Sequence, residues 1–435
     1  MKQDWEIKRL NEISQNLDNR RIPITKNIRS SGTIPYYGAS GIVDFVKEYL
    51  FDEDLLLVSE DGANLLARTY PIAFSISGKT WVNNHAHVLK FQNSTTQQFV
   101  ELYLNSIKLD DFVSGMAQPK LNQTMLNKIP IPLPPLSEQQ RIVAILDEAF
   151  AAIAKAKTNA EQNLKNAKEL FESYLQGVFD PSTRTGKENE SWEEQRLGNI
   201  TTKIGSGATP RGGNASYKSE GVSLIRSMNV HDFDFREKNL AFIDDNQAKD
   251  LNNVTLQKND VLLNITGASV ARCCVIPNQY LPARVNQHVS IIRAKTEIID
   301  SVFLNILLTS KYYKDQLLFT GEQGATRQAI TKAQLEVFKV AFPKSLKVQH
   351  TIVTKLNALS IETKRLASLY QQKINDLEEL KKSVLQKAFN GQLSESGLVG
   401  LKDKQDFLVS KKTSEFSYQQ NSESNNINVE NHKIL

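Results

Sequence analysis

The fold is decided by the stretch from Ser137 to Asp180, SEQQRIVAILDEAFAAIAKAKTNAEQNLKNAKELFESYLQGVFD, because its pattern predicts one long helix. Alternating steps of four and three residues from Ile142 meet mostly apolar or small side chains. These positions are Ile142, Leu146, Ala149, Ile153, Ala156, Ala160, Asn163, Ala167, Leu170, Tyr174 and Gly177. A seven-residue apolar repeat of this kind predicts the seam of a coiled coil.

The same pattern returns 210 residues later, near the end of the chain. The shifted positions are Ile352, Leu356, Leu359, Thr363, Leu366, Tyr370, Lys373, Leu377, Leu380, Val384 and Lys387. Outside the seam, the shift also pairs Phe179 with Phe389. Since no gap is needed along the whole helix, the pattern indicates an internal duplication.

The ends of both helices carry sequence signals. Ser137 with Gln140 three residues later predicts a capping box at the start of the first helix. Asn390-Gly391 predicts a left-handed terminus for the second. The second copy lacks the clean cap, because Lys347 stands where the first has Ser137.

Length and composition bound the class of protein. At 435 residues, with 40% hydrophobic and 23% charged residues, the chain predicts a soluble protein of several modules. No apolar run is long enough to span a bilayer, and we expect a cytoplasmic protein. Cys273 and Cys274 are the only cysteines, which excludes a disulfide framework. The net charge of +5 permits a polyanionic partner without requiring one.

The region before the first helix, residues 1–135, predicts a mixed α/β domain. Strand-like runs cover residues 54–60 and 80–91, a helix is expected around residues 97–109, and glycines mark the turns. We expect the first long helix at 136–180 and a polar linker at 181–191.

A second, divergent copy of this domain is predicted at residues 192–345. Trp192 to Leu197 repeats Trp5 to Leu10, and Val285-Asn-Gln-His288 repeats Val82-Asn-Asn-His85. The second long helix follows at 346–393, and the polar tail at 394–435 is expected to be disordered.

This order predicts an α+β protein in which two mixed α/β domains are separated by two long antiparallel helices. The helices are expected to form a coiled coil within an internal pseudo-two-fold repeat. Pairing them about their midpoints sets Asn163 opposite Thr363, a polar pair that could fix the register. A helix of this length spans roughly 60 Å at 1.5 Å per residue. Two related domains on such a spacer suit a ligand with two separated half-sites, for which duplex DNA is the obvious candidate.

The residues also resemble a known family. The run Pro132 to Val143, PLPPLSEQQRIV, the duplicated helix and the ending Leu385 to Gly391, LQKAFNG, are similar to the specificity (S) subunits of type I restriction–modification systems. The resemblance covers nearly the whole chain to about residue 395. The second copy departs from it at Pro343 to His350, where the proline-rich lead-in is missing.

The resemblance implies a function and partners. Two target-recognition domains each read half of a split, asymmetric site on double-stranded DNA, in defence against foreign DNA. The conserved helices dock two methyltransferase (M) subunits, and motor-nuclease restriction (R) subunits join that core. S-adenosylmethionine, ATP and Mg are then expected on the partners, with no cofactor in this chain. On the first helix we expect docking on the outer face, at Lys155, Lys157, Glu161 and Lys165.

The motifs in the sequence that resemble catalytic sites lack the context that catalysis needs. Residues 73–80, AFSISGKT, fit a loose phosphate-loop pattern, but a strand-like run follows where that loop needs a helix. His85 and His87 lack a third metal ligand at a suitable spacing. Glu6-Ile-Lys8 and Glu362-Thr-Lys364 resemble part of a nuclease site, yet neither follows a strand with a suitable Asp. The chain is therefore predicted to be non-catalytic, with no metal site.

Direct DNA contacts are expected from polar and basic residues in glycine-marked loops, because such side chains hold phosphates and read base edges. In the first domain they are Lys79, Asn83, Asn84, His85, Gln118 and Lys120. In the second they are Thr209, Arg211, Arg226, Asn229, Arg272, Gln287, His288 and Arg327. Two other functions stay open at this point: a stand-alone nuclease or DNA methyltransferase, and a coiled-coil scaffold that never meets DNA.

Overall fold

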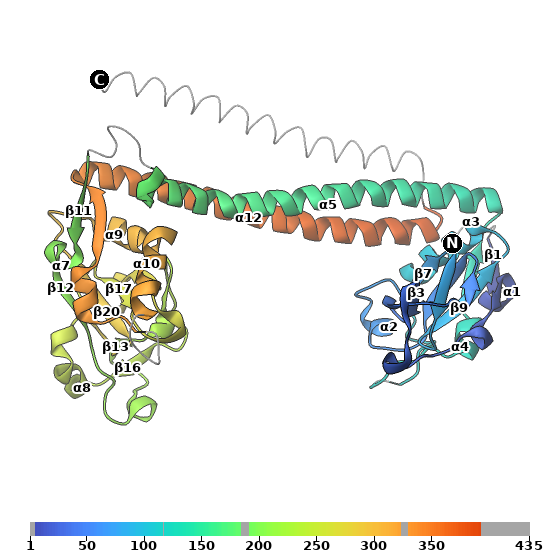
Figure 1. Ribbon diagram of the computed structural model, residues 1–435, viewed down its shortest axis with the longest axis horizontal. Helices are drawn as coiled ribbons and strands as arrows, with labels where there is room; N and C mark the ends of the chain where they lie inside the picture. The colour runs from blue at the N-terminus through green and yellow to red at the C-terminus, as the bar shows by residue number, and fades with distance from the viewer. Residues whose placement is uncertain (1–4, 116, 184–190, 323–328, 393–435) are drawn as a thin grey trace, which may run out of the picture. The chain divides into compact units, whose positions relative to one another are not determined.

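The computed structural model describes residues 5–115, 117–183, 191–322 and 329–392. It forms two compact units, one of residues 1–159 with the chain from 373 onward, the other of residues 160–372. Each unit holds an α/β module and part of both long helices, α5 (Leu136–Phe179) and α12 (Leu346–Phe389), as Figure 1 shows. Module 1 denotes the elements before α5, and module 2 those between the two helices.

Module 1 is built from two sheets and short helices. One sheet has the order β2 (Ser14–Asn16), β9 (Ala86–Phe91), β6 (Leu55–Ser59) and β7 (Ala73–Ile76). The other has the order β4 (Gly41–Val46), β3 (Ser31–Gly38), β8 (Lys79–Val82) and β5 (Phe51–Asp52). A separate pair joins β1 (Glu6–Arg9) to β10 (Pro130–Leu133). The helices are α1 (Leu10–Ile13), α2 (Asn64–Ala67), α3 (Ser94–Ser106) and α4 (Gln123–Asn127).

Module 2 repeats this plan with different lengths. Its main sheet has the order β12 (Thr201–Ser206), β20 (Val289–Ala294), β17 (Val261–Asn264) and β18 (Cys273–Val275). A second sheet has the order β16 (Ala241–Ile243), β13 (Val222–Ile225) and β19 (Ala283–Val285), and β14 (Val230–His231) pairs with β15 (Asp234–Phe235). The pair β11 (Trp192–Arg196) and β21 (Lys339–Pro343) corresponds to β1 and β10. The helices are α7 (Leu197–Ile200), α8 (Asp245–Asp250), α9 (Ser301–Thr309), α10 (Lys311–Glu322) and α11 (Lys332–Val337).

The core of each module extends onto the long helices. Phe389 of α12 packs edge-on against Phe99 and Tyr103 of α3, with ring centroids 5.3 Å apart in both pairs. In module 2, Phe179 of α5 packs against Phe303 at 5.4 Å and Trp192 at 6.3 Å. Phe179 and Phe389, which the duplication pairs, therefore have equivalent structural roles, because each packs the end of its helix into an aromatic cluster.

The predicted antiparallel pairing of the helices is confirmed within each unit. In the first unit, Ile142 and Leu146 of α5 share a core cluster with Val384 and Ala388 of α12, and Lys157 lies 2.5 Å from Glu378. Rising numbers on α5 thus meet falling numbers on α12. The second unit shows the same order in the cluster that contains Leu175, Phe179, Ile352 and Leu356.

The predicted seam is right for most of α12, but in the second half of α5 it is right only at Ala160 and Ala167. Asn163, Leu170 and Tyr174 are exposed. The side chains that face inward there are Ala160, Leu164, Ala167, Phe171, Leu175 and Val178. From Ile142 to Val178 the inward stripe takes ten steps over 36 residues, which is the 3.6-residue period of a straight helix rather than a strict heptad. The expected polar pair does not form, since Thr363 is buried and Asn163 faces solvent.

The helix ends differ partly from expectation. Helix α5 begins at Leu136, so Ser137 lies inside the first turn and does not act as the predicted N-cap. Instead, buried Gln139 donates to the Pro134 carbonyl over 2.8 Å, and buried Gln349 donates to the Pro343 carbonyl over 2.8 Å in the second copy. The predicted end of α12 is confirmed, because Gly391 has a φ of +71° directly after the last turn.

Candidate DNA interface

A short loop joins β8 to β9 in module 1 and β19 to β20 in module 2; we call residues 83–85 and 286–288 the central loops. In module 1 the Asn83 side-chain oxygen accepts from the His85 amide over 2.8 Å. The Asn83 amide donates to the Tyr37 carbonyl over 3.0 Å, and the Glu60 amide donates to the His85 carbonyl over 2.9 Å. These bonds fix the loop and leave the Asn84 and His85 side chains exposed.

Module 2 has the same bonds at the matching positions. The Asn286 side-chain oxygen accepts from the His288 amide over 3.0 Å. The Asn286 amide donates to the Ile225 carbonyl, and the Ile265 amide donates to the His288 carbonyl, each over 3.0 Å. The sequence match between Val82–His85 and Val285–His288 therefore marks one loop geometry used twice.

Two further segments lie beside each central loop. The Leu121 amide donates to the Glu60 carbonyl over 2.8 Å, as the Ile330 amide does to the Ile265 carbonyl in module 2. We call residues 118–120, just before Leu121, the flanking loop.

The other segment, which we call the tip segment, follows β3 or β13 and comprises residues 38–41 and 226–229. The Ser59 hydroxyl donates to the Ala39 carbonyl over 2.5 Å, and the Asn264 amide group donates to the Ser227 carbonyl over 2.9 Å. In module 1 sequence reasoning missed this segment, because Ala39 and Ser40 carry no side-chain signal; only the flanking Gly38 and Gly41 marked a turn.

The structure brings together some of the residues predicted for module 1. His85 Nδ1 lies 2.8 Å from Asp61 Oδ2, and Lys120 Nζ lies 3.1 Å from Glu60. Asn84 and Gln118 are exposed on the same two loops. Lys79 is exposed at the opposite end of β8, where it lies over the Tyr49 ring at 4.8 Å. Asn83 does not fit the expected direct contact, because its side chain is buried and supports its own loop.

The residues predicted for module 2 do not all lie together; two contact groups can be distinguished among them. Thr209 and Gln287 are hydrogen-bonded to each other, and Gln287 Nε2 lies 3.2 Å from His288 Nε2. Arg272 lies 3.5 Å from His231 Nδ1.

The remaining predicted residues of module 2 include two from the tip segment, Arg226 and Asn229, together with Arg211. Arg226 lies over the Tyr217 ring at 5.2 Å, and Arg211 is exposed. Asn229 does not fit a direct contact, since it is fully buried and donates to the Arg236 carbonyl over 2.8 Å. Arg327 lies outside the described residues, as do the predicted tail 394–435 and most of the linker.

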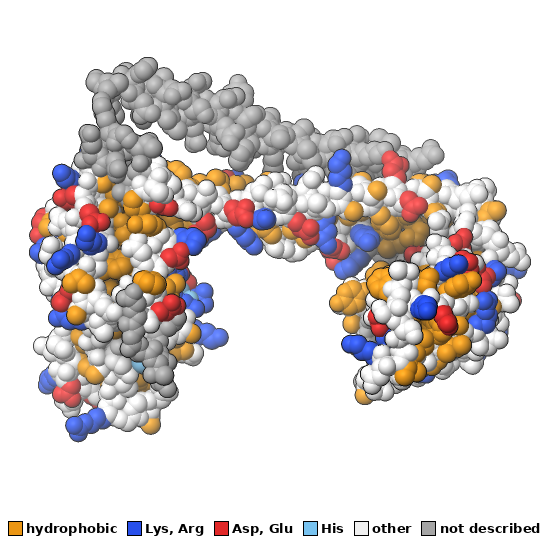
Figure 2. Space-filling model, viewed as in Figure 1, with side chains coloured by type: hydrophobic (Ala, Val, Ile, Leu, Met, Phe, Trp, Pro, Cys, Tyr) orange, Lys and Arg blue, Asp and Glu red, His pale blue; other side chains and the backbone are white. Residues whose placement is uncertain are grey.

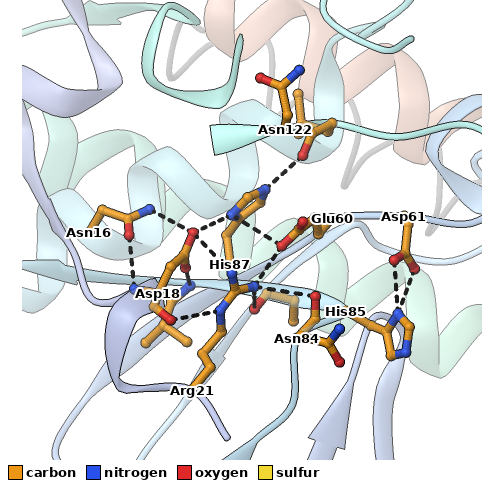
Figure 3. A network of polar contacts seen from close by, with 12 residues as sticks. Asn16, Asp18, Arg21, Glu60, Asp61, Asn84, His85, His87 and Asn122 are labelled. Atoms are coloured by element: carbon orange, nitrogen blue, oxygen red, sulfur yellow. Dashed lines mark hydrogen bonds and ion pairs between the residues drawn. The ribbon is translucent and has the colours of Figure 1, made fainter. Parts of the chain in front are cut away.

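A buried charged network lies beneath the loops of module 1 (Figure 3). Asp18, Glu60 and His87 place ligand atoms within 4.8 Å of one another, an arrangement that could hold a metal ion. However, the Arg21 guanidinium lies 2.7 Å from Glu60, and Lys120 approaches the same carboxylate. The cationic side chains already supply the charge that a metal would bring, so the residues do not favour an ion.

Burial and hydrogen bonding oppose each other in this network. Burial alone raises the pKa of Asp18, but hydrogen bonding and charge from His87 outweigh it, and the pKa lies below its usual range. Burial likewise raises the pKa of Glu60, while Arg21 and the positive groups around it bring that pKa below its usual value. Both carboxylates are therefore held in their charged form.

The surfaces of both units mix charge and apolar groups, as Figure 2 shows. Among the described residues, no helix combines the length and apolar character that crossing a bilayer requires.

The fold and the repeated loops define a class of protein with two related α/β modules and paired helices. The family model described as type I restriction modification DNA specificity domain matches residues 2–164 and 189–379. The chain belongs to this family, and the resemblance seen in the sequence is confirmed.

Individual relatives agree with this assignment. The chain is 40% identical over 146 residues to S.HindORF215P of Haemophilus influenzae, but this match spans only 37% of that relative and 34% of the chain. It is 22% identical to the type I restriction enzyme MjaVIII specificity subunit of Methanocaldococcus jannaschii, over 90% of the chain and 93% of the relative.

Solved structures share the fold. The HsdS subunit from Thermoanaerobacter tengcongensis superposes with a TM-score of 0.60 at 18% identity, covering 90% of this chain and 98% of that one. A chain from a structure of type I R-M complex assembly and conformational transition gives 0.63 at 19% identity, covering 89% and 98%. These likenesses confirm the predicted fold class.

Proposed function

We propose that the chain is the DNA-recognition and scaffolding subunit of a type I restriction–modification complex. One observation supports this proposal most directly. The same hydrogen-bonded central loop occurs twice, in a chain whose two halves both match the specificity family. Two copies of one loop arrangement that carry different exposed side chains suit a split, asymmetric DNA site. The predicted domain limits, 1–135 and 192–345, remain part of this proposal.

The exposed residues of the loops fit DNA reading. In module 1 we propose Asn84, His85, Gln118 and Lys120 as contacts, because they project from adjoining loops over a rigid base. In module 2 the corresponding group is Thr209, Gln287 and His288, with Arg272 beside it. Asn and Gln side chains suit adenine, while Lys and Arg suit phosphate or guanine.

The long helices are proposed to dock two methyltransferase subunits, with restriction subunits joining the complex. Lys155, Glu161 and Lys165 are exposed, as the predicted docking face requires. Lys157 instead pairs with Glu378 of α12 and belongs to the helix pair. Leu170 and Tyr174, one turn apart, add an apolar ridge with 46% and 42% exposure. Exposed apolar groups of this kind mark protein contacts.

Catalysis is proposed to reside on the partners, which would carry S-adenosylmethionine, ATP and Mg. The alternative of a stand-alone enzyme predicts cutting or methylation by the purified chain. A scaffold that never meets DNA predicts no sequence preference at all. Nothing in the described loops or helices favours either alternative.

The proposal is tested by co-expressing the full chain with a neighbouring adenine methyltransferase, if its locus encodes one, and mapping methylated adenines. We expect a split, asymmetric motif, of which one half changes when module 2 is exchanged for that of a relative. The double variant Leu170→Ser with Tyr174→Ser should weaken co-purification of the methyltransferase at least tenfold, whereas Glu220→Ser on module 2 should not. Absence of new methylation, or a motif indifferent to the exchange, contradicts the proposal.

A further inference from the structure

The buried network of module 1 centres on His87 of β9, whose side chain is 1% exposed. Its Nδ1 lies 2.6 Å from Asp18 Oδ2, and its Nε2 lies 2.7 Å from the Leu121 carbonyl oxygen. Figure 3 shows the ring beside Asp18 and Glu60. The ring therefore links η1 (Asp18–Arg20) to Leu121, the residue that follows the flanking loop.

Both partners of the ring are acceptors. A carbonyl oxygen has no proton to give. Asp18 accepts from the Val88 amide over 2.8 Å and from the Asn16 side chain over 3.1 Å, as an ionised carboxylate does. The ring therefore lies between two acceptor oxygens, one from the Asp18 carboxylate and one from the Leu121 backbone.

Arg21 connects the network to the central loop. Its guanidinium donates to Glu60 over 2.7 Å, to the Ala86 carbonyl over 2.8 Å and to the Asn84 carbonyl over 3.4 Å. The two carbonyls stand on either side of His85. One planar side chain therefore fixes the backbone from which the exposed Asn84 and His85 project.

The charged groups around the ring come from every segment that packs on it. Asp18 and Arg21 come from the turn after β2, Glu60 from the end of β6 and Lys120 from the flanking loop. Arg21 Nη2 also lies 3.5 Å from Asp18. Removal of one member leaves another buried charge without its partner, and such an imbalance is expensive.

We infer that Asp18, Arg21, Glu60 and His87 are positioning residues of the first reading module, and that their ionic network sets how sharply that module discriminates its half of a DNA site. This inference rests on the proposed function. None of the four is placed to contact DNA; each acts through the central and flanking loops.

The described residues of module 2 have no such ionic network at the matching positions, which makes the inference specific to one half-site. Ile265 stands where module 1 has Glu60, and Ser290 where it has His87. The module 2 central loop is held by the Gly207 amide, which donates to the Asn286 carbonyl over 3.1 Å. Disturbance of the module 1 network should therefore leave the second half-site unchanged.

The experiment selects binding sites for the full chain from a random pool of double-stranded DNA. Glu60→Gln and His87→Gln are compared with wild type, and Gln287→Ala identifies the half of the motif that module 2 reads. Glu53→Gln is the matched control, because Glu53 also pairs with two basic groups, Arg20 and Lys90, but at the opposite end of β6. We expect Glu60→Gln and His87→Gln to reduce base preference at least tenfold in the other half alone, and Glu53→Gln to change neither half.

One measurement needs no DNA and separates this inference from the proposed function. Hydrogen exchange at residues 83–88 and 118–121 should accelerate at least tenfold in Glu60→Gln but not in Glu53→Gln.

The outcomes distinguish the two hypotheses. A wild-type chain that selects no motif refutes the proposed function, and the hydrogen-exchange data still test the network. Unchanged hydrogen exchange, two intact half-sites or equal loss of both halves overturns the inference.

Discussion

Modules 1 and 2 hold the same loop arrangement with different chemistry. Module 1 fixes its central loop with Arg21, whose guanidinium is buried among Asp18, Glu60 and His87. Module 2 fixes the same loop by a close backbone approach at Gly207, where an added Cβ would lie 1.9 Å from the Val285 carbonyl oxygen. The shared part is a set of backbone hydrogen bonds, which constrain side chains little. The two modules could therefore diverge in sequence while they kept the same backbone arrangement of the loops.

The largest expected loss of stability comes from removing a feature that both modules share, the buried aromatic residue at one end of each long helix. Phe179→Ala and Phe389→Ala should each lower the free energy of unfolding by about 3–5 kcal/mol, because each removes a buried ring from a packed cluster. Urea unfolding of the full chain measures the loss. Phe319→Ala is the control, since Phe319 is 63% exposed and should change stability by less than about 0.5 kcal/mol. A loss below about 1 kcal/mol at either anchor would show that the anchors are not equivalent supports.

The next effect separates the modules. Gly207→Ala should destabilise module 2 by roughly 2–3 kcal/mol, the range for strain forced into a packed site, because the new methyl meets the Val285 backbone. Gly205→Ala, two residues earlier, is the matched control, since no atom lies within 4 Å of its added Cβ. Calorimetry of both variants checks the difference. Equal melting temperatures for the two would mean that the close approach is not what holds the loop.

The smallest expected effect is the pH dependence of the stability that Glu60 contributes to module 1. The folded-state pKa of Glu60 lies below its ordinary value of 4.5, so its charge contributes stability above that pH, and this contribution is lost as the pH falls through the folded pKa. Wild type should exceed Glu60→Gln by roughly 1–3 kcal/mol at neutral pH, the range for hydrogen bonds to charged groups.

This difference should shrink below about pH 4.5, because protonated Glu60 and glutamine are both neutral. Denaturant titrations at stepped pH measure it. A difference that stays constant into acid would exclude the charge of Glu60 as the source of the stability.

Several features could be predicted from the sequence because they depend on local patterns. The duplication located both helices, and the repeated Val-Asn-x-His run matched the two modules to each other. The strand-like run predicted over residues 80–91 was wrong in its middle, because the central loop at 83–85 separates β8 from β9. The N-cap prediction at Ser137 was wrong, because the Pro135 carbonyl already accepts the first amide bonds and the helix begins at Leu136.

The candidate site was less predictable, since side-chain direction depends on partners far along the chain. Asn83 and Asn229 looked like DNA contacts, but hydrogen bonds to their own loops bury them. The network went unseen for the same reason. Asp18 and His87 are 69 residues apart, and no spacing rule joins them.

The sequence by itself determined the order of the modules, the length of the helices and their apolar repeat, because backbone periodicity is a local property. Tertiary structure decided which residues of that repeat face inward. Beyond Ala167 the inward stripe of α5 lies one residue later than the predicted seam, which leaves Leu170 and Tyr174 exposed. The physical reason is that a straight helix turns every 3.6 residues, while packing of Phe171, Leu175 and Val178 against the core of module 2 selects the buried face.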